Sequence, residues 1–257
     1  RPLIQAIVDV IAPKPGETIS DPACGTGGFL LAAHDYVVGQ NPHMTKEERK
    51  ALKEGTFKGW ELVQATARLC AMNLMLHGIG GSDSDLPLAV ADSLAADPGE
   101  RFDIILTNPP FGKKSSTTIV GEDGKVARET ETIERDDFWA TTSNKQLNFM
   151  QHVKTLLKQH GRAAVVVPDN VLFEGGAGET IRRKLLHECN VHTLLRLPTG
   201  LFYAQGVKAN VLFFERKPAS ETPWTRKLWI YDLRTNIHFT LKTNPLKRSD
   251  LDEFVQL

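Results

Sequence analysis

An asparagine, two prolines and a phenylalanine follow a short apolar run, and together they could hold a planar amine. The run 102–107 is typical of a buried strand. Pro109 and Pro110 have no N–H groups for a central strand, so the chain must leave the sheet in a stiff turn. The Asn108 side-chain oxygen and the Pro109 carbonyl can accept from one exocyclic amine, while Phe111 stacks on its ring. A rigid strand-end turn with a buried phenylalanine is the alternative, and an upstream electrophile site would decide between the two.

A glycine-rich turn lies upstream, between a predicted strand at 18–20 and a predicted helix, as at the start of a Rossmann-like unit. Its glycines are too close together for the dinucleotide pattern, and Asp21 would repel a pyrophosphate. An aspartate beside the N–H groups of a helix start suits an ammonium next to a carboxylate. That pair matches the methionine end of S-adenosylmethionine. The residues that we expect at this cofactor are Asp21, Cys24, Gly25, Thr26, Gly27, Gly28 and Phe29.

Two more acidic residues follow predicted strands at 57–61 and 87–91. Glu61 is placed to bind a ribose diol, although a lone glutamate can also be a solvated charge. Asp92 could accept a hydrogen bond from an adenine amine. Open α/β sheets bind ligands at the carboxyl ends of their strands, where both residues and the asparagine turn are expected. The adjoining residues included in the predicted cofactor site are Leu62, Ser93 and Leu94.

The other patterns predict the surroundings of this edge. Residues 3–11 have helical spacing, and a capping box at Thr45 opens a short helix within a polar insertion at 39–56. Residues 62–76 predict a helix with a buried apolar stripe, and Met72 and Met75 are interpreted as core packing. The stripe comprises Leu62, Ala65, Leu69, Met72 and Leu76.

The polar segment 112–143 has no hydrophobic periodicity and is expected to be a structureless loop. It could be a mobile lid over DNA, with Lys113 and Lys114 near phosphates, or a disordered surface loop. Residues 217–226 suggest a linker, and 228–231 form one more strand-like run. We therefore divide the chain into a catalytic domain at 1–216 and a C-terminal extension at 217–257.

Composition limits the possible functions. The 257 residues contain 31 basic and 31 acidic side chains, so binding to nucleic acid needs a local basic face or a partner. Three distant cysteines without a Cys-x-x-Cys pair argue against zinc or a disulfide framework and favour a reducing cytoplasm. No apolar run reaches the roughly 18 residues of a membrane span. The first residue is Arg1 rather than methionine, so we expect a fragment of a longer polypeptide.

The order and wording of these motifs resemble the amino-methyltransferases of DNA. More closely, Asp-Pro-Ala-Cys-Gly-Thr-Gly-Gly-Phe at 21–29 and Asn-Pro-Pro-Phe-Gly at 108–112 resemble the modification (M) subunit of type I restriction–modification systems. The similarity continues through Val-Val-Pro-Asp-Asn-Val-Leu-Phe at 166–173 and Leu-Pro-Thr-Gly-Leu-Phe at 197–202. It therefore covers most of the chain.

The resemblance implies an α/β, Rossmann-like, seven-stranded S-adenosylmethionine-dependent methyltransferase fold with a mostly parallel sheet and helices on both faces. It implies methylation of the 6-amino group of a flipped adenine in double-stranded DNA. A specificity (S) subunit would select the site, and a restriction (R) subunit and a second M subunit could join. In this family a Phe-Thr-Pro-Arg segment packs over the cofactor after an N-terminal helical domain, and Arg1 matches its last residue.

Other functions share these motifs. A self-sufficient type II-like DNA adenine methyltransferase would carry the same turn, as would methyltransferases that act on RNA amines or protein amides. A non-enzymatic assembly scaffold would not need to keep Asp21, Glu61, Asp92 and Asn108 together.

Overall fold

A single eight-stranded sheet organises the computed structural model, which describes residues 1–80, 86–112, 115–120, 126–201, 208–234, 239–240 and 243–257. The strand order is β10-β8-β9-β7-β4-β1-β2-β3, and only β9 runs antiparallel to its neighbours. The strands are β1 (Ile19–Asp21), β2 (Phe57–Trp60), β3 (Leu88–Ala89), β4 (Phe102–Thr107), β7 (Leu157–Pro168), β8 (Cys189–Arg196), β9 (Ala209–Arg216) and β10 (Trp229–Asp232).

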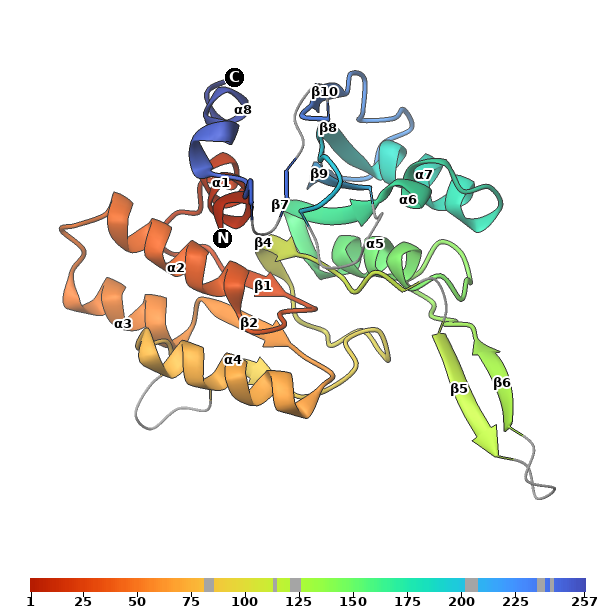
Figure 1. The fold of residues 1–257 in the computed structure, drawn as a ribbon, viewed down its shortest axis with the longest axis horizontal. Helices are drawn as coiled ribbons and strands as arrows, with labels where there is room; N and C mark the ends of the chain where they lie inside the picture. Colours follow the sequence, from red (N-terminus) through yellow and green to blue (C-terminus); the bar gives the residue numbers. More distant parts are fainter. Residues whose placement is uncertain (81–85, 113–114, 121–125, 202–207, 235–238, 241–242) are drawn as a thin grey trace.

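Helices cover both faces of the sheet, as expected from the sequence (Figure 1). Successive strand residues point to opposite faces, so Ile104 and Leu106 join one apolar cluster and Ile105 joins the other. The first cluster includes side chains from α1 (Pro2–Ile11), α2 (Gly28–Gln40), α3 (Lys46–Glu54), α4 (Gln64–Leu76) and α8 (Asp252–Gln256). The second includes side chains from α5 (Lys145–Leu156), α6 (Asp169–Phe173) and α7 (Ala177–Glu188).

The predicted strand count of seven is wrong, because β10 adds an eighth strand in parallel beside β8. The 3₁₀ helix η1 (Arg248–Leu251) and α8 then return to α1, where Arg248 Nε donates to Asp9 Oδ2 at 2.9 Å. Figure 1 shows α8 beside α1. The division at residues 216 and 217 stays a prediction.

The apolar stripe predicted on α4 is wrong. Leu69, Met72 and Leu76 are 52%, 59% and 81% exposed, and Met75 is also exposed, so neither methionine is core packing. The buried face consists of Ala67, Cys70 and Leu74. The side chain at Cys70 is small because the glycine-rich turn approaches closely there: a Cβ on Gly27 would lie 3.0 Å from Cys70 Sγ. The positions of the large hydrophobic residues therefore predicted the wrong buried face of α4.

The expectation of a structureless segment at 112–143 is also wrong. Strands β5 (Ser115–Val120) and β6 (Val126–Glu131) form an antiparallel hairpin, which projects from the body of the fold (Figure 1). Lys113 and Lys114 lie outside the described residues. The return segment is tied to α5, since Arg135 Nη1 lies 3.2 Å from His152 Nδ1 and Asp137 Oδ2 accepts from Thr155 Oγ1. The lid hypothesis stays a prediction.

The capping box predicted at Thr45 is confirmed. Thr45 Oγ1 accepts from the Glu48 N–H at 3.2 Å, and Glu48 Oε2 accepts from the Thr45 N–H at 2.7 Å. Among the described residues, no helix is both long and apolar enough to cross a membrane.

Candidate methyl-donor and amine site

Four parallel strands that are adjacent in the sheet, β4-β1-β2-β3, place the predicted polar residues along one edge. Asp21 ends β1, Glu61 follows β2, Asp92 lies beyond β3 and Asn108 follows β4. Because parallel strands share their carboxyl edge, these residues from separate parts of the chain come to one side of the sheet. The sequence prediction of a shared edge is confirmed.

Hydrogen bonds join the loops at this edge. The Gly25 N–H donates to Glu61 Oε2 at 3.0 Å, and Ser93 Oγ donates to the Pro22 carbonyl at 2.7 Å. The carbonyl of Thr26 accepts from Asn73 Nδ2 at 2.9 Å, so α4 also holds the glycine-rich turn. The loops after β1, β2 and β3 therefore form one connected surface.

Glycine is needed at two points of the turn. Gly25 and Gly27 have φ angles of +55° and +85°, in the left-handed region that side chains disfavour. A Cβ on Gly25 would meet no atom within 4 Å, so the chain there is open to a neighbouring molecule. A Cβ on Gly27 would press on Cys70, so this glycine serves the packing against α4.

Asp21 is the most perturbed acid of the edge. Its side chain is only 2% exposed, and burial raises its pKa to about 7. The Thr107 hydroxyl and the Ala23 amide oppose that rise in pKa, and the nearby Glu61 carboxylate adds to it. A buried carboxylate of this kind is destabilised until a cation approaches, as the ammonium of an amino acid would.

Apolar side chains that could cover a planar base remain exposed beside Glu61. Leu62 is 60% exposed, Val63 is 54% exposed, and Val90, next to Asp92, is 55% exposed. Asp92 itself is exposed, with its Oδ1 accepting from the Leu94 N–H at 2.9 Å. One edge of the sheet thus carries a buried carboxylate at Asp21, a second carboxylate at Glu61 and exposed apolar side chains, a set that could hold a ligand with an ammonium, a diol and a planar base.

Three predicted cofactor residues have side chains in the core. Phe29 is 4% exposed, Leu94 is 2% exposed, and Cys24 is 5% exposed with its Sγ 3.8 Å from Cys70 Sγ. The hydrogen bond with Cys70 and burial raise the pKa of the Cys24 thiol, which therefore stays protonated. Only the backbones of these residues are placed to serve a ligand.

The turn at 108–111 was predicted to hold an amine, and its residues differ in exposure. Asn108 and Pro110 are exposed, Pro109 is buried, and Phe111 is half-buried against the first core cluster. Gln146, which sequence reasoning missed, donates from Nε2 to the carbonyls of Pro110 and Gly112 at 3.2 and 2.9 Å. No local sequence pattern predicts these contacts, because Gln146 lies 34 residues after Gly112 and 36 residues after Pro110.

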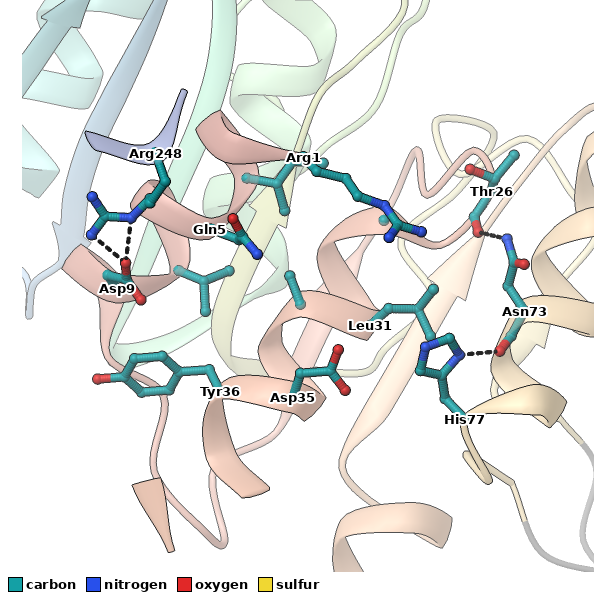
Figure 2. A pocket seen from close by; sticks show the side chains of 14 residues that line it. Arg1, Gln5, Asp9, Thr26, Leu31, Asp35, Tyr36, Asn73, His77 and Arg248 are labelled. Atoms are coloured by element: carbon teal, nitrogen blue, oxygen red, sulfur yellow. Dashed lines mark hydrogen bonds and ion pairs between the residues drawn. The ribbon is translucent and has the colours of Figure 1, made fainter. Parts of the chain in front are cut away.

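A cavity of about 560 Å³ lies between α1, α2 and α4. Thr26 and Gly28 belong to its lining, but Asp21, Glu61 and Asn108 do not. Figure 2 shows Arg1, at the start of α1, on the same hollow as Asn73 and His77. Arg1 thus shares this cavity with Thr26 of the glycine-rich turn, and Asp21 and Glu61 do not line it.

Comparisons with known proteins agree with this arrangement. The family model described as N-6 DNA Methylase matches residues 1–257. The chain is 44% identical to the type I restriction enzyme StySPI methylase subunit of Salmonella potsdam, over 99% of this chain and 47% of that protein. It is equally similar to the EcoKI methylase subunit of Escherichia coli strain K12, again over 47% of that protein.

Solved structures show the same fold. The EcoKI M protein superposes with a TM-score of 0.87 at 42% identity, covering 99% of this chain and 52% of that one. A chain from a structure on complex assembly of the type I R-M system gives a TM-score of 0.79 at 32% identity, covering 99% and 48%. The chain thus spans about half the length of the relatives that it matches. Its methyltransferase fold is confirmed, and the chain belongs to the N-6 DNA methylase family.

Proposed function

We propose that the protein containing this chain transfers a methyl group from S-adenosylmethionine to the 6-amino group of adenine in DNA. The observation that carries this proposal is the shared edge, where Asp21 and Glu61 lie next to the strand that delivers Asn108. The 44% identity to type I methylase subunits supports the same reaction. S-adenosylmethionine would supply a methyl group already activated as a sulfonium.

The residues of this chain would act mainly by position. Asp21 would hold the ammonium of the cofactor, Glu61 its ribose diol, and Asp92 its adenine amine. The N–H groups at the start of α2 would face its carboxylate. Leu62 would cover the base.

On the substrate side, the target adenine must leave the duplex, because its amine is paired and stacked there. The Asn108 side-chain oxygen and the Pro109 carbonyl would accept both amine hydrogens, while Phe111 stacks on the ring. This directs the nitrogen lone pair away from the ring and toward the methyl group. The nitrogen would bond to the methyl carbon of S-adenosylmethionine, the electron pair of the broken sulfur–carbon bond would stay on sulfur, and the methylated amine would release one proton to water. No residue has to change its protonation state to start the reaction, since an aryl amine is already neutral.

Partners follow from charge and from the relatives. The chain is electrically neutral, and duplex DNA is bound largely through its phosphates. We therefore propose that a specificity subunit supplies most DNA contacts, with a restriction subunit and a second methylase subunit in the larger complex. The relatives are named as subunits of type I restriction enzymes, which supports this assembly.

The test is transfer of tritium from labelled S-adenosylmethionine to unmethylated bacterial DNA. The full-length protein is assayed with and without the specificity subunit encoded beside it. N6-methyladenine that appears only with the partner supports the proposal. Transfer by the protein alone would indicate a self-sufficient enzyme, and label in RNA or protein would refute the proposed substrate.

A further inference from the structure

Gln146 is a buried side chain that touches the amine-binding turn without belonging to it. It lies near the start of α5 and is 4% exposed. Its Nε2 donates to the Pro110 and Gly112 carbonyls, which flank Phe111 on either side. Carbonyl oxygens can only accept, so the amide nitrogen must face them, and the orientation of the carboxamide is determined.

The turn has few other means of being fixed. Pro109 and Pro110 have no N–H to donate, so the turn can be held only through its carbonyls and the remaining amides. The Gly112 N–H does donate to the Pro110 carbonyl at 3.0 Å, which closes the turn on itself. Phe111 packs against the first core cluster, and Gln146 ties the closed turn to α5 through its two hydrogen bonds.

That element is rigid. The N-cap of α5 is Asn144, whose Oδ1 accepts from the Gln146 N–H at 3.0 Å. Asn144 Nδ2 donates to Glu174 Oε2 at 2.8 Å, and Asn170 Nδ2 donates to the same oxygen at 3.1 Å. Gln146 therefore lies on a helix start that is itself hydrogen-bonded to the segment after β7. Such supporting hydrogen bonds keep a positioning side chain in a fixed orientation.

The free energy of folding alone does not account for Gln146. Its Oε1 is buried and has no hydrogen-bond partner among the described residues. A buried acceptor without a partner lowers stability, and a positioning role is one explanation for such a group in a native protein. The donating half of the amide is used on the turn while the accepting half is left unpaired.

We propose that Gln146 is a positioning residue for methyl transfer, an inference that rests on the proposed function. It holds the Pro110 and Gly112 carbonyls, and through them sets the directions of the Asn108 oxygen, the Pro109 carbonyl and the Phe111 ring. It does not contact the base or the methyl donor. Loss of the Gln146 side chain weakens the positioning of the amine-binding groups and leaves the residues at Asp21 and Glu61 unchanged.

The main variant is Gln146→Glu in the full-length protein with its specificity subunit. The introduced carboxylate has the same shape but cannot donate, and it faces two carbonyl oxygens. A displacement of about 1 Å at a reacting group lowers rates roughly 100-fold. At pH 8 we therefore expect kcat to fall about 100-fold, with the Kd for S-adenosylmethionine within about twofold of the original protein.

Gln151→Glu is the matched control. Gln151 is another buried glutamine of α5, and its carboxamide makes two hydrogen bonds with the backbone of Ala140, at 2.9 and 3.0 Å. The variant loses a donor of the same kind on the same helix, away from the turn. Its kcat should stay within about threefold of the original, since a change at Gln151 leaves the hydrogen bonds between Gln146 and the turn in place.

A pH profile separates positioning from a general loss of structure. When protonated, the introduced carboxyl at position 146 can again donate to a carbonyl, and burial between two carbonyls raises its pKa. The ratio of kcat for Gln146→Glu to kcat for the original protein should therefore rise as the pH is lowered from 8 to 6. Saturating cofactor removes any effect on cofactor affinity from this ratio.

Gln146→Asn is measured alongside in case the charged variant does not fold. Its shorter side chain keeps the donor but cannot span both carbonyls, so kcat should fall at least about tenfold. An unchanged kcat in both variants would overturn the inference. So would a loss that is independent of pH and equal in Gln151→Glu. Failure of the original protein to methylate DNA would instead refute the proposed function.

Discussion

The raised pKa of Asp21 predicts that cofactor binding depends on pH. With a pKa of about 7, the Asp21 carboxyl is mostly protonated at pH 5.5 in the free protein. An ammonium ligand needs the carboxylate, so binding at low pH must first remove a proton. The affinity for S-adenosylmethionine should therefore decrease as the pH falls below 7, and the ammonium of the ligand stays charged throughout this range.

The size of the effect follows from the ionised fraction. That fraction is about one half at pH 7 and about 0.03 at pH 5.5 for a pKa of about 7. Because the apparent Kd is the intrinsic Kd divided by the competent fraction, it should rise about 16-fold between these pH values. Isothermal titration calorimetry of the full-length protein measures this directly. Buffers of different ionisation enthalpy should show about half a proton released per ligand at pH 7.

Two variants complete the experiment. Asp21→Asn should bind the cofactor roughly 10- to 100-fold more weakly at pH 7, because it loses a charge-assisted contact, and its pH dependence should vanish. Asp103→Asn is the control: Asp103 lies near the start of β4 and accepts from Thr18 and Lys158. Its pKa is lowered despite burial, through hydrogen bonds from Lys158 and Thr18, so it stays ionised over this range. A pH-independent Kd in the original protein would refute the assigned role of Asp21.

Further predictions concern stability and the ribose contact. Burial raises the pKa of Asp21, so ionisation of this carboxyl between pH 5.5 and pH 8 lowers the stability of the original protein. Asp21→Asn removes this ionisation, so its gain in free energy of unfolding over the original protein should be about 2 kcal/mol larger at pH 8 than at pH 5.5. Urea unfolding at both pH values measures this, and a gain that is the same at both pH values would contradict it. Leu74→Ala should lower that free energy by about 2–5 kcal/mol, whereas Met72→Ala should change it by less than about 0.5 kcal/mol; equal effects would contradict the assigned faces of α4. Glu61→Ala should weaken cofactor binding at least about tenfold by calorimetry, and unaltered affinity would exclude the diol contact.

The carboxyl edge could be predicted from the sequence because its signals are local. Each of Asp21, Glu61, Asp92 and Asn108 stands at the end of a short predicted strand, and parallel strands necessarily bring such positions to one edge. Neither the strand order nor any contact between the loops was needed for that step. The eighth strand was visible as a strand-like run, but its place beside β8 depends on pairing that no local pattern encodes.

The features that were missed depend on close packing between distant segments. The exposed face of α4 carries Leu69, Met72 and Leu76, and the buried face has the small Cys70 where Gly27 lies against it. The sequence of the β5–β6 hairpin lacks the regular alternation of apolar and polar residues that predicts a half-buried strand. In the sequence, Gln146 has no feature that separates it from other helix residues. Only the folded structure shows its hydrogen bond to the Pro110 carbonyl.

The measurement that most directly tests the central claim compares Asn108→Ala with the original protein. Both are assayed as full-length protein with the specificity subunit, and N6-methyladenine in unmethylated DNA is quantified. Removing one preorganised polar group at a reacting centre lowers rates by roughly 100- to 1,000-fold. We expect a loss of at least that size, with the affinity for S-adenosylmethionine unchanged. If Asn108→Ala retained more than about a tenth of the methylation rate, the Asn-Pro-Pro-Phe turn would not be the amine site.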